Sequence, residues 1–234
     1  MISPIVAASP QNLRSQLALL DLTVAPRSMG RTTEQTERFA LAHFLASLPR
    51  DRLAFPVTVT HSDRPDLVLD TAAGSIGVEI TEAVPQNVAH KAAIRESGIG
   101  PNIHFVEHAT PGEPKRSASV LIQEIKRDAP GEPWVGNAPE NEWAAAMLSF
   151  VTAKRDKALK PGFALHDKNW LLVYDNWPLP HIHHEEAAEI LAASCESAGV
   201  FNTFDRVFVL DSTCLCELGG EIVLYDARSP SASV

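Results

Sequence analysis

Two acidic residues, Asp66 and Glu79, stand on neighbouring predicted strands in the stretch RPDLVLDTAAGSIGVEITEA, residues 64–83. Apolar residues alternate there and predict strands over residues 66–70 and 76–81, joined by a turn of small residues. Because successive side chains of a strand face opposite sides of the sheet, pairing of these strands could bring both carboxylates onto one face. Carboxylates that close repel each other unless a cation lies between them, and Mg²⁺ or Mn²⁺ prefers such oxygen ligands.

Both acids also have a purely structural interpretation. Glu79 could be a solvent-facing residue of an antiparallel sheet with one wet face, since strand alternation produces apolar neighbours in any case. Asp66 could begin a strand and accept hydrogen bonds from the amides of a turn. The spacing of the two residues leaves this interpretation and the metal site both open.

The motif around the two acids resembles the core of the PD-(D/E)XK nuclease superfamily. PD at 65–66 is followed, after a gap of hairpin length, by GVEIT at 77–81. The family is named for Pro-Asp and then an acid, any residue and a lysine on the next strand. The resemblance covers about residues 32–174 and implies a restriction-endonuclease-like fold, in which helices flank a mixed central sheet. The order of the predicted helices and strands by itself predicts a mixed-sheet α/β domain.

The resemblance also implies roles for particular residues. Asp66, Glu79 and the backbone carbonyl of Ile80 would bind Mg²⁺ or Mn²⁺, with Glu37 on the preceding helix assisting. Such enzymes hydrolyse phosphodiester bonds, so the implied partner is nucleic acid, DNA in preference to RNA. Many enzymes of this fold pair to cut both strands, which leaves a homodimer open.

The sequence departs from the family pattern at Thr81, which stands where the family has its lysine. Threonine can hydrogen-bond a water molecule but cannot supply positive charge to a transition state. Lys154 and Lys157 continue the apolar stripe of a helix predicted over residues 141–159, so they could supply that charge. Both could instead extend into solvent at the end of this helix. Lys91 is a weaker candidate for the same role.

Two other functions stay open. The missing lysine and the net charge of −9 favour a catalytically inactive nuclease-like domain that binds nucleic acid or serves as a regulatory subunit. The second is a small-molecule hydrolase built on PHIHHEE at 180–186, which would need His181, His183 and a distant acid to converge on a metal ion. The same residues could simply form the solvated start of a helix.

Composition limits the class of protein. The 234 residues are 45% hydrophobic, which is enough for one sizeable core. With 29 acidic and 20 basic residues, the chain is no binder of nucleic acid by bulk charge, although a local basic groove is compatible with these numbers. No apolar run approaches the roughly 18 residues of a membrane span, and we expect no signal peptide.

Three cysteines, two of them in the CxC at 214–216, predict small apolar side chains packed in strands rather than disulfides or a zinc site. We therefore expect a reducing compartment and a cytoplasmic protein. Proline and glycine positions divide the chain into a lead-in over residues 1–30 with one short helix and a single nuclease-like domain over 31–226. Within that domain residues 101–140 are expected to be an insertion, and residues 227–234 a disordered tail.

Overall fold

The computed structural model describes residues 4–230, and at its centre lies a mixed sheet of eight strands that follow one another across the sheet in chain order. Strands β4, β5 and β6 are parallel to each other, and all other neighbours are antiparallel. The strands are β1 (Ile5–Ala7), β2 (Val57–His61), β3 (Leu67–Thr71), β4 (Gly74–Ala83), β5 (Lys168–Asp175), β6 (Arg206–Leu210), β7 (Cys214–Leu218) and β8 (Val223–Asp226).

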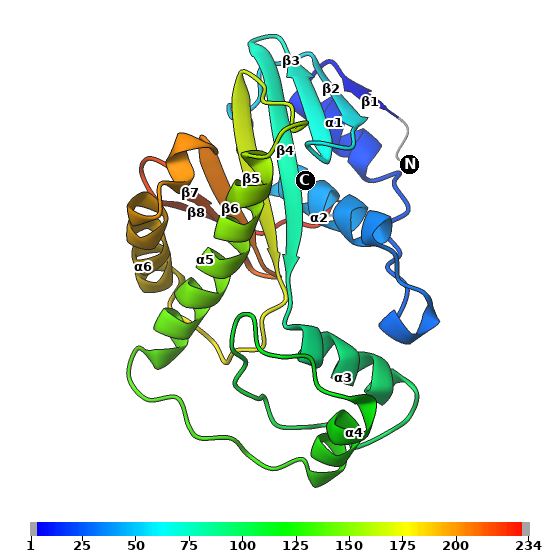
Figure 1. Ribbon diagram of the computed structural model, residues 1–234. Helices are drawn as coiled ribbons and strands as arrows, with labels where there is room; N and C mark the ends of the chain where they lie inside the picture. Colours follow the sequence, from blue (N-terminus) through cyan, green and yellow to red (C-terminus); the bar gives the residue numbers. More distant parts are fainter. Residues whose placement is uncertain (1–3, 231–234) are drawn as a thin grey trace.

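Within residues 4–230 six α-helices surround this sheet, and the prediction of a mixed α/β domain is confirmed (Figure 1). The helices are α1 (Pro10–Leu17), α2 (Thr33–Ser47), α3 (Gln86–Glu96), α4 (Ala118–Arg127), α5 (Ala138–Ala158) and α6 (His184–Ser197), with short 3₁₀ turns η1 (Arg27–Met29) and η2 (Val200–Asn202). One core packs α1 and α2 against one face of the sheet, and a second packs α5 and α6 against the other.

Strands β3 and β4 form the predicted hairpin, but β4 is longer than its partner. The pairing of the two strands begins at Leu67 opposite Val78, whereas β4 continues alongside β5 as far as Ala83. Residues 79–83 therefore have a neighbouring strand on one side only. Ile80 and Val78 point into the core beneath α2, so Glu79 between them points to the α5 face of the sheet.

Helix α2 is positioned by a reciprocal cap at its first turn. The Thr32 hydroxyl accepts a hydrogen bond from the Gln35 backbone N–H at 3.2 Å, and the Gln35 side chain accepts one from the Thr32 N–H at 3.1 Å. Apolar side chains such as Leu41 and Phe44 are fully buried against the sheet. The capped end of the helix, with Glu37 just beyond its first turn, is thereby held beside β4.

The lead-in contributes more than the short helix predicted from its sequence. Its strand β1 pairs with β2, Ile5 lying opposite Val59, and Leu13 and Leu17 of α1 are buried. Strand β1 has only three residues, too few for a visible alternation of apolar side chains. At the other end, the Arg228 N–H donates to the Ser47 hydroxyl at 2.8 Å. The expected disordered tail otherwise falls on residues 231–234, which lie outside the described residues.

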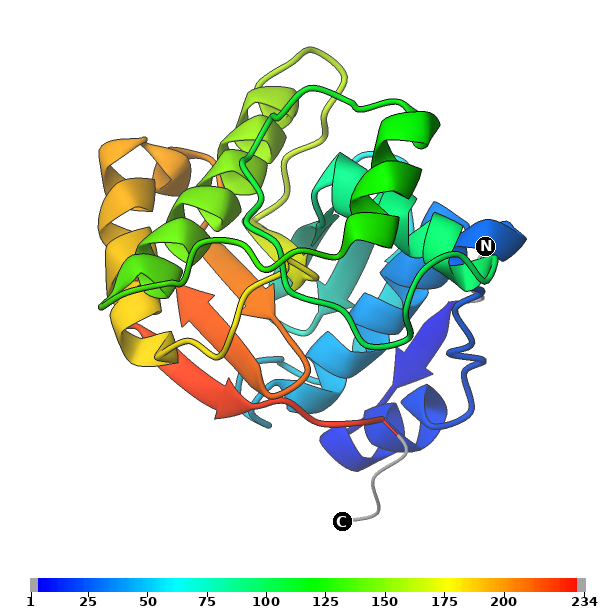
Figure 2. The same ribbon diagram turned by 90° about the horizontal axis from the view of Figure 1, so that it is seen from below.

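The segment expected to be an insertion lies between α3 and α5 and contains α4. Figure 2 shows this segment and α3 lying across one end of the sheet. In the part of the chain that the structure describes, no helix has the length and apolar character that crossing a membrane would need.

Candidate active site beside strand β4

Glu79 is a buried carboxylate that faces two lysines. Its side chain has no exposed surface, and its Oε1 atom lies 2.8 Å from Nζ of Lys154 and 2.8 Å from Nζ of Lys157. Its other oxygen, Oε2, is buried and has no hydrogen-bond partner among the described residues. Glu79 is therefore not the solvent-facing strand residue of the structural interpretation, and half of its bonding capacity is unused.

Asp66 directly precedes β3 and turns its carboxylate towards the unpaired edge of β4. Its Oδ2 atom accepts a hydrogen bond from the Ile80 backbone N–H at 2.6 Å and lies 3.8 Å from Nζ of Lys154. Burial raises the pKa of Asp66, although the Ile80 N–H and Lys154 act in the opposite direction. Because the N–H and C=O of a strand residue point to the same side, the Ile80 carbonyl also faces this edge.

Helix α5 supplies the two lysines, which are 75 and 78 residues from Glu79 in the sequence. They lie on the face that packs Trp143 and Met147 against the sheet, so the extended apolar stripe brings both ammonium groups inward rather than into bulk solvent. The Lys154 side chain is 18% exposed and that of Lys157 is 45% exposed. The hydrogen bond to Glu79 raises the pKa of Lys157, so this lysine stays charged.

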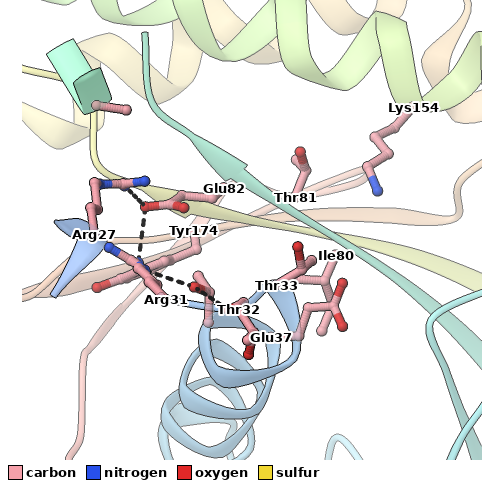
Figure 3. A pocket seen from close by; sticks show the side chains of 12 residues that line it. Arg27, Arg31, Thr32, Thr33, Glu37, Ile80, Thr81, Glu82, Lys154 and Tyr174 are labelled. Carbon is pink, nitrogen blue, oxygen red and sulfur yellow. Dashed lines mark hydrogen bonds and ion pairs between the residues drawn. The ribbon is translucent and has the colours of Figure 1, made fainter. Parts of the chain in front are cut away.

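Glu37 approaches the same place from α2. Burial raises the pKa of Glu37 to about 7, and the negative charge of Asp66 adds to the effect. No hydrogen bond to its carboxylate is found among the described residues. Glu37, Lys154 and Thr81 line one cavity of about 420 Å³, and Figure 3 shows the Thr81 side chain and the Lys154 ammonium group on the same side of β4.

The far end of this cavity contains two arginines that the sequence reasoning did not single out. Arg27 and Arg31 both donate to Oε1 of Glu82, at 2.6 Å and 3.1 Å (Figure 3), and the Asn176 amide donates to the same atom at 2.8 Å. The sequence does contain a signal for this pair, since the two arginines are four residues apart and the second directly precedes the residue that caps a helix. Glu82 is 55 residues from Arg27, so no local pattern announces that pairing.

The residues present suit a hard divalent cation by the chemistry of their donor atoms. The orphaned Oε2 of Glu79, the second oxygen of Asp66 and the Ile80 carbonyl are all oxygen donors, as Mg²⁺ and Mn²⁺ prefer. Within residues 4–230, however, no group of three or more His, Cys, Asp or Glu side chains is arranged to hold a metal ion. Binding of Mg²⁺ or Mn²⁺ by Asp66, Glu79, Ile80 and Glu37 stays a prediction.

Lys91, the weaker candidate for the missing cation, lies elsewhere. Its side chain is 2% exposed and pairs with Glu107 and with Glu124, the latter at 2.7 Å. These acids belong to the segment between α3 and α5, so Lys91 holds that segment to α3. Among the described residues Lys91 makes its ion pairs with these two acids and not with Asp66 or Glu79, so the structure gives no support to Lys91 as the missing catalytic cation.

The histidine cluster does not bring together the residues that a hydrolase of this kind would need. His184, rather than His181 or His183, meets a distant acid, with its Nε2 atom 2.7 Å from Oδ2 of Asp211. Asp211 also accepts hydrogen bonds from backbone N–H groups of Thr213 and Cys214, each at 2.6 Å. Burial acts against ionisation, but the hydrogen bonds from His184 and these amides lower the pKa of Asp211 to about 2. A cavity of about 440 Å³ adjoins this pair.

The three cysteines are free thiols, as their spacing predicts. Cys195 and Cys216 are buried, and burial raises the pKa of Cys216 to about 12. Burial likewise raises the pKa of Cys214 to about 11. These thiols are therefore packed as small apolar groups rather than activated.

Comparison with known proteins yields no relative: no family model, no curated protein and no solved structure matches the chain significantly. The structure itself shows the α/β fold with its mixed sheet. Any closer assignment depends on the motif at residues 65–66 and 77–81 and on the geometry around it.

Proposed function

We propose that this protein is a divalent-metal-dependent nuclease of the PD-(D/E)XK type, with a restriction-endonuclease-like fold. The observation that carries the proposal is the position of Lys154, whose Nζ atom lies 2.8 Å from Glu79 and 3.8 Å from Asp66. A cation thus stands beside both acids although the motif has Thr81 in place of lysine. Lys154 reaches the site from a helix 75 residues further along the chain.

In this mechanism Asp66, Glu79 and the Ile80 carbonyl would hold Mg²⁺ or Mn²⁺, and Glu37 would assist in its ionised form. The bound ion would lower the pKa of a water molecule and offset charge on the scissile phosphate. The Thr81 hydroxyl, which lines the cavity, would orient the attacking water by a hydrogen bond. Lys154 would stabilise the charge that develops on the phosphoryl oxygens.

The reaction is a hydrolysis and needs no further reactant. The water oxygen forms a bond to phosphorus, one phosphorus–oxygen ester bond breaks, and the departing oxygen takes up a proton. The products are a phosphate monoester and an alcohol. DNA is the proposed substrate in preference to RNA, the cell compartment is proposed to be the cytoplasm, and a homodimer would allow both strands of a duplex to be cut.

A second candidate function is a nuclease-like domain that binds nucleic acid or regulates a partner without catalysis. The specific observation in its favour is that two ammonium groups already contact Oε1 of Glu79. The buried carboxylate is therefore compensated without any metal ion. In this case Lys154 and Lys157 serve the stability of the fold alone.

Cleavage of labelled DNA and RNA, single- and double-stranded, with Mn²⁺ or Mg²⁺ distinguishes the two. The enzyme proposal predicts cleavage by the wild type and by Lys160→Met, an exposed control on the same side of the molecule, and loss of cleavage in Glu79→Gln. Calorimetry should show Mn²⁺ binding that Glu79→Gln weakens. If the folded wild-type protein neither cuts nucleic acid nor binds Mn²⁺, the nuclease proposal is contradicted and the non-catalytic function is favoured.

A further inference from the structure

The cavity beside β4 reaches from two of the proposed metal ligands, Glu37 and Ile80, to the arginine pair, while Asp66 and Glu79 lie behind its lining. Glu37 and Lys154 line one part of it, and Arg27, Arg31 and Glu82 line another. Figure 3 shows the two arginines converging on Glu82 at a distance along the strand from Lys154. A substrate that reaches the site therefore also meets these two guanidinium groups.

The arginines are held rigidly and retain free donors. The Arg27 side chain is 22% exposed and that of Arg31 is 18% exposed, and both contact one oxygen of Glu82. The Arg31 Nε atom also donates to the Thr36 hydroxyl at 3.0 Å. A guanidinium group has five N–H donors, so each arginine keeps donors for a ligand. The two guanidinium groups share the carboxylate of Glu82, so its single negative charge faces two positive charges.

The rest of this part of the cavity also suits an anion. Thr32 and Thr33 line it, and with them the first turn of α2 faces the arginines. The start of a helix carries partial positive charge, which favours a phosphate, although the Gln35 N–H of this turn already donates to the Thr32 hydroxyl. Arginine forks match phosphate oxygens in geometry as well as charge.

Near the arginines, the cavity is bordered by helix α3 and the turn η1. Segment η1 packs against α3, the Ser28 backbone N–H donates to Glu96 at 2.7 Å, and Ala89 of α3 lines the cavity. A nucleic acid strand that continued past Arg27 would meet these elements. The whole cavity has a volume of about 420 Å³, which is in the range of small-ligand pockets.

We infer that the Arg27–Arg31 pocket binds the terminal phosphate monoester of a nucleic acid strand, so that hydrolysis at Asp66 and Glu79 starts from a phosphorylated end. This inference rests on the proposed function and adds the class of substrate. According to this inference, the substrate must have a strand end, and a phosphate on that end increases the rate of hydrolysis.

The test uses one DNA sequence in four forms: with a 5′-phosphate, with a 3′-phosphate, with hydroxyl groups at both ends, and as a covalently closed circle. With Mn²⁺, the wild type should hydrolyse one phosphorylated form at least ten times faster than the hydroxyl form and leave the circle intact. The 5′ and 3′ forms identify the end. Equal rates on phosphorylated and hydroxyl ends, or efficient cutting of the circle, would overturn the inference while the nuclease function stands.

Variants connect the preference to the pocket. Arg31→Gln should remove the preference for a phosphorylated end, whereas Arg127→Gln, an exposed arginine on α4, should leave both the preference and the rates unchanged. Arg31→Lys keeps the charge and replaces the Gln variant if melting shows that the latter is unfolded. A preference that survives in a folded Arg31 variant contradicts the assignment to this pocket.

A binding measurement separates failure of the inference from failure of the proposed function. Anisotropy of a labelled oligonucleotide without divalent metal should show tighter binding, by about tenfold, when the end carries phosphate. If nothing is cut but this difference is seen and Arg31→Gln removes it, phosphate recognition stands and catalysis does not. Equal dissociation constants for the two ends would overturn the inference regardless of cleavage.

Discussion

The site around Glu79 and the cluster around Asp211 are both built from buried or partly buried charged groups, yet their carboxylates are used differently. Asp211 has both oxygens in hydrogen bonds, one with His184 and the other with backbone amides. Glu79 presents one oxygen to two ammonium groups and leaves the other without a partner in the described part of the chain.

This difference separates a cluster that fixes structure from a site with spare bonding capacity. An unpartnered buried polar atom costs about 1–3 kcal/mol, and a fold retains it where another requirement outweighs that loss. At Asp211 every oxygen is satisfied within the protein, so no ligand is needed to explain the arrangement. At Glu79 the free Oε2 atom, together with Asp66, is explained if a cation completes the site.

The difference between Glu79 and Asp211 is tested most strongly by removing the carboxylate charge from each in turn. Under the proposed function, Glu79→Gln should lower the rate of phosphodiester cleavage about 100-fold or more, because it removes a proposed ligand of the ion that would activate water. Asp211→Asn should change that rate less than about twofold. Initial rates on one labelled DNA substrate with Mn²⁺ measure both, and a similar loss in the two variants would contradict the distinction.

The two lysines sharpen the comparison within the first site. Lys154→Met should lower the cleavage rate by about 10- to 100-fold, because this ammonium group alone contacts both acids. Lys157→Met should lower it less, since Lys157 is more exposed and contacts only Glu79. Single-turnover rates of both variants, with Lys160→Met as the control, test the order, and a larger effect at Lys157 would reverse the assignment.

The His184–Asp211 pair should affect stability instead of activity. The pKa of His184 is raised by its hydrogen bond to Asp211, and that of Asp211 is lowered to about 2. The contribution of the histidine is therefore complete below about pH 6.5 and fades as the pH rises through its raised pKa, while that of the aspartate fades as the pH falls below about 4. His184→Gln should cost about 1 kcal/mol at pH 5.5 and less at pH 8.5 in urea titrations. Equal losses at the two pH values would contradict this account.

Glu37 should show a similarly small effect, which like that of His184 reduces stability as the pH rises. Its pKa is raised to about 7, so the folded state holds a proton that the unfolded state loses near pH 4.5, and the free energy of unfolding should fall between these pH values. After allowance for solvent screening, the fall is on the order of 1 kcal/mol. Glu37→Gln should remove it, and Mn²⁺ should offset it in the wild type at pH 8. If Glu37→Gln shows the same dependence of the free energy of unfolding on pH as the wild type, Glu37 is not the source of the fall.

Much of the fold and the centre of the site could be predicted from local patterns in the sequence. Period-two alternation predicted that Asp66 and Glu79 could share one face of paired strands, and helical spacing predicted that Lys154 and Lys157 could lie on an inward face. These predictions succeed because each depends on geometry within one or two elements. Strand β1 was missed because three residues carry too little periodicity, and pairing with β2 decides its conformation.

The remaining residues of the site are joined by contacts that no local pattern encodes. Arg27 and Glu82 are separated by 55 residues, and Lys91 is taken up by acids from the segment after α3. Which lysine reaches Glu79 depends on how α5 crosses the sheet, which the sequence alone does not specify. The roles of charged residues are therefore harder to predict than the elements that carry them.

The two halves of the site also differ in when they can form during folding. Asp66 and Ile80 are 14 residues apart, whereas Lys154 and Lys157 come to Glu79 across 75 and 78 residues. Closing the short loop costs less chain entropy, so the hairpin with its carboxylates can form before α5 docks. In that order of events Glu79 stays hydrated until α5 arrives, and the docking of this helix both buries the carboxylate and places two ammonium groups beside it. The packing of α5 and the completion of the proposed site are therefore one event.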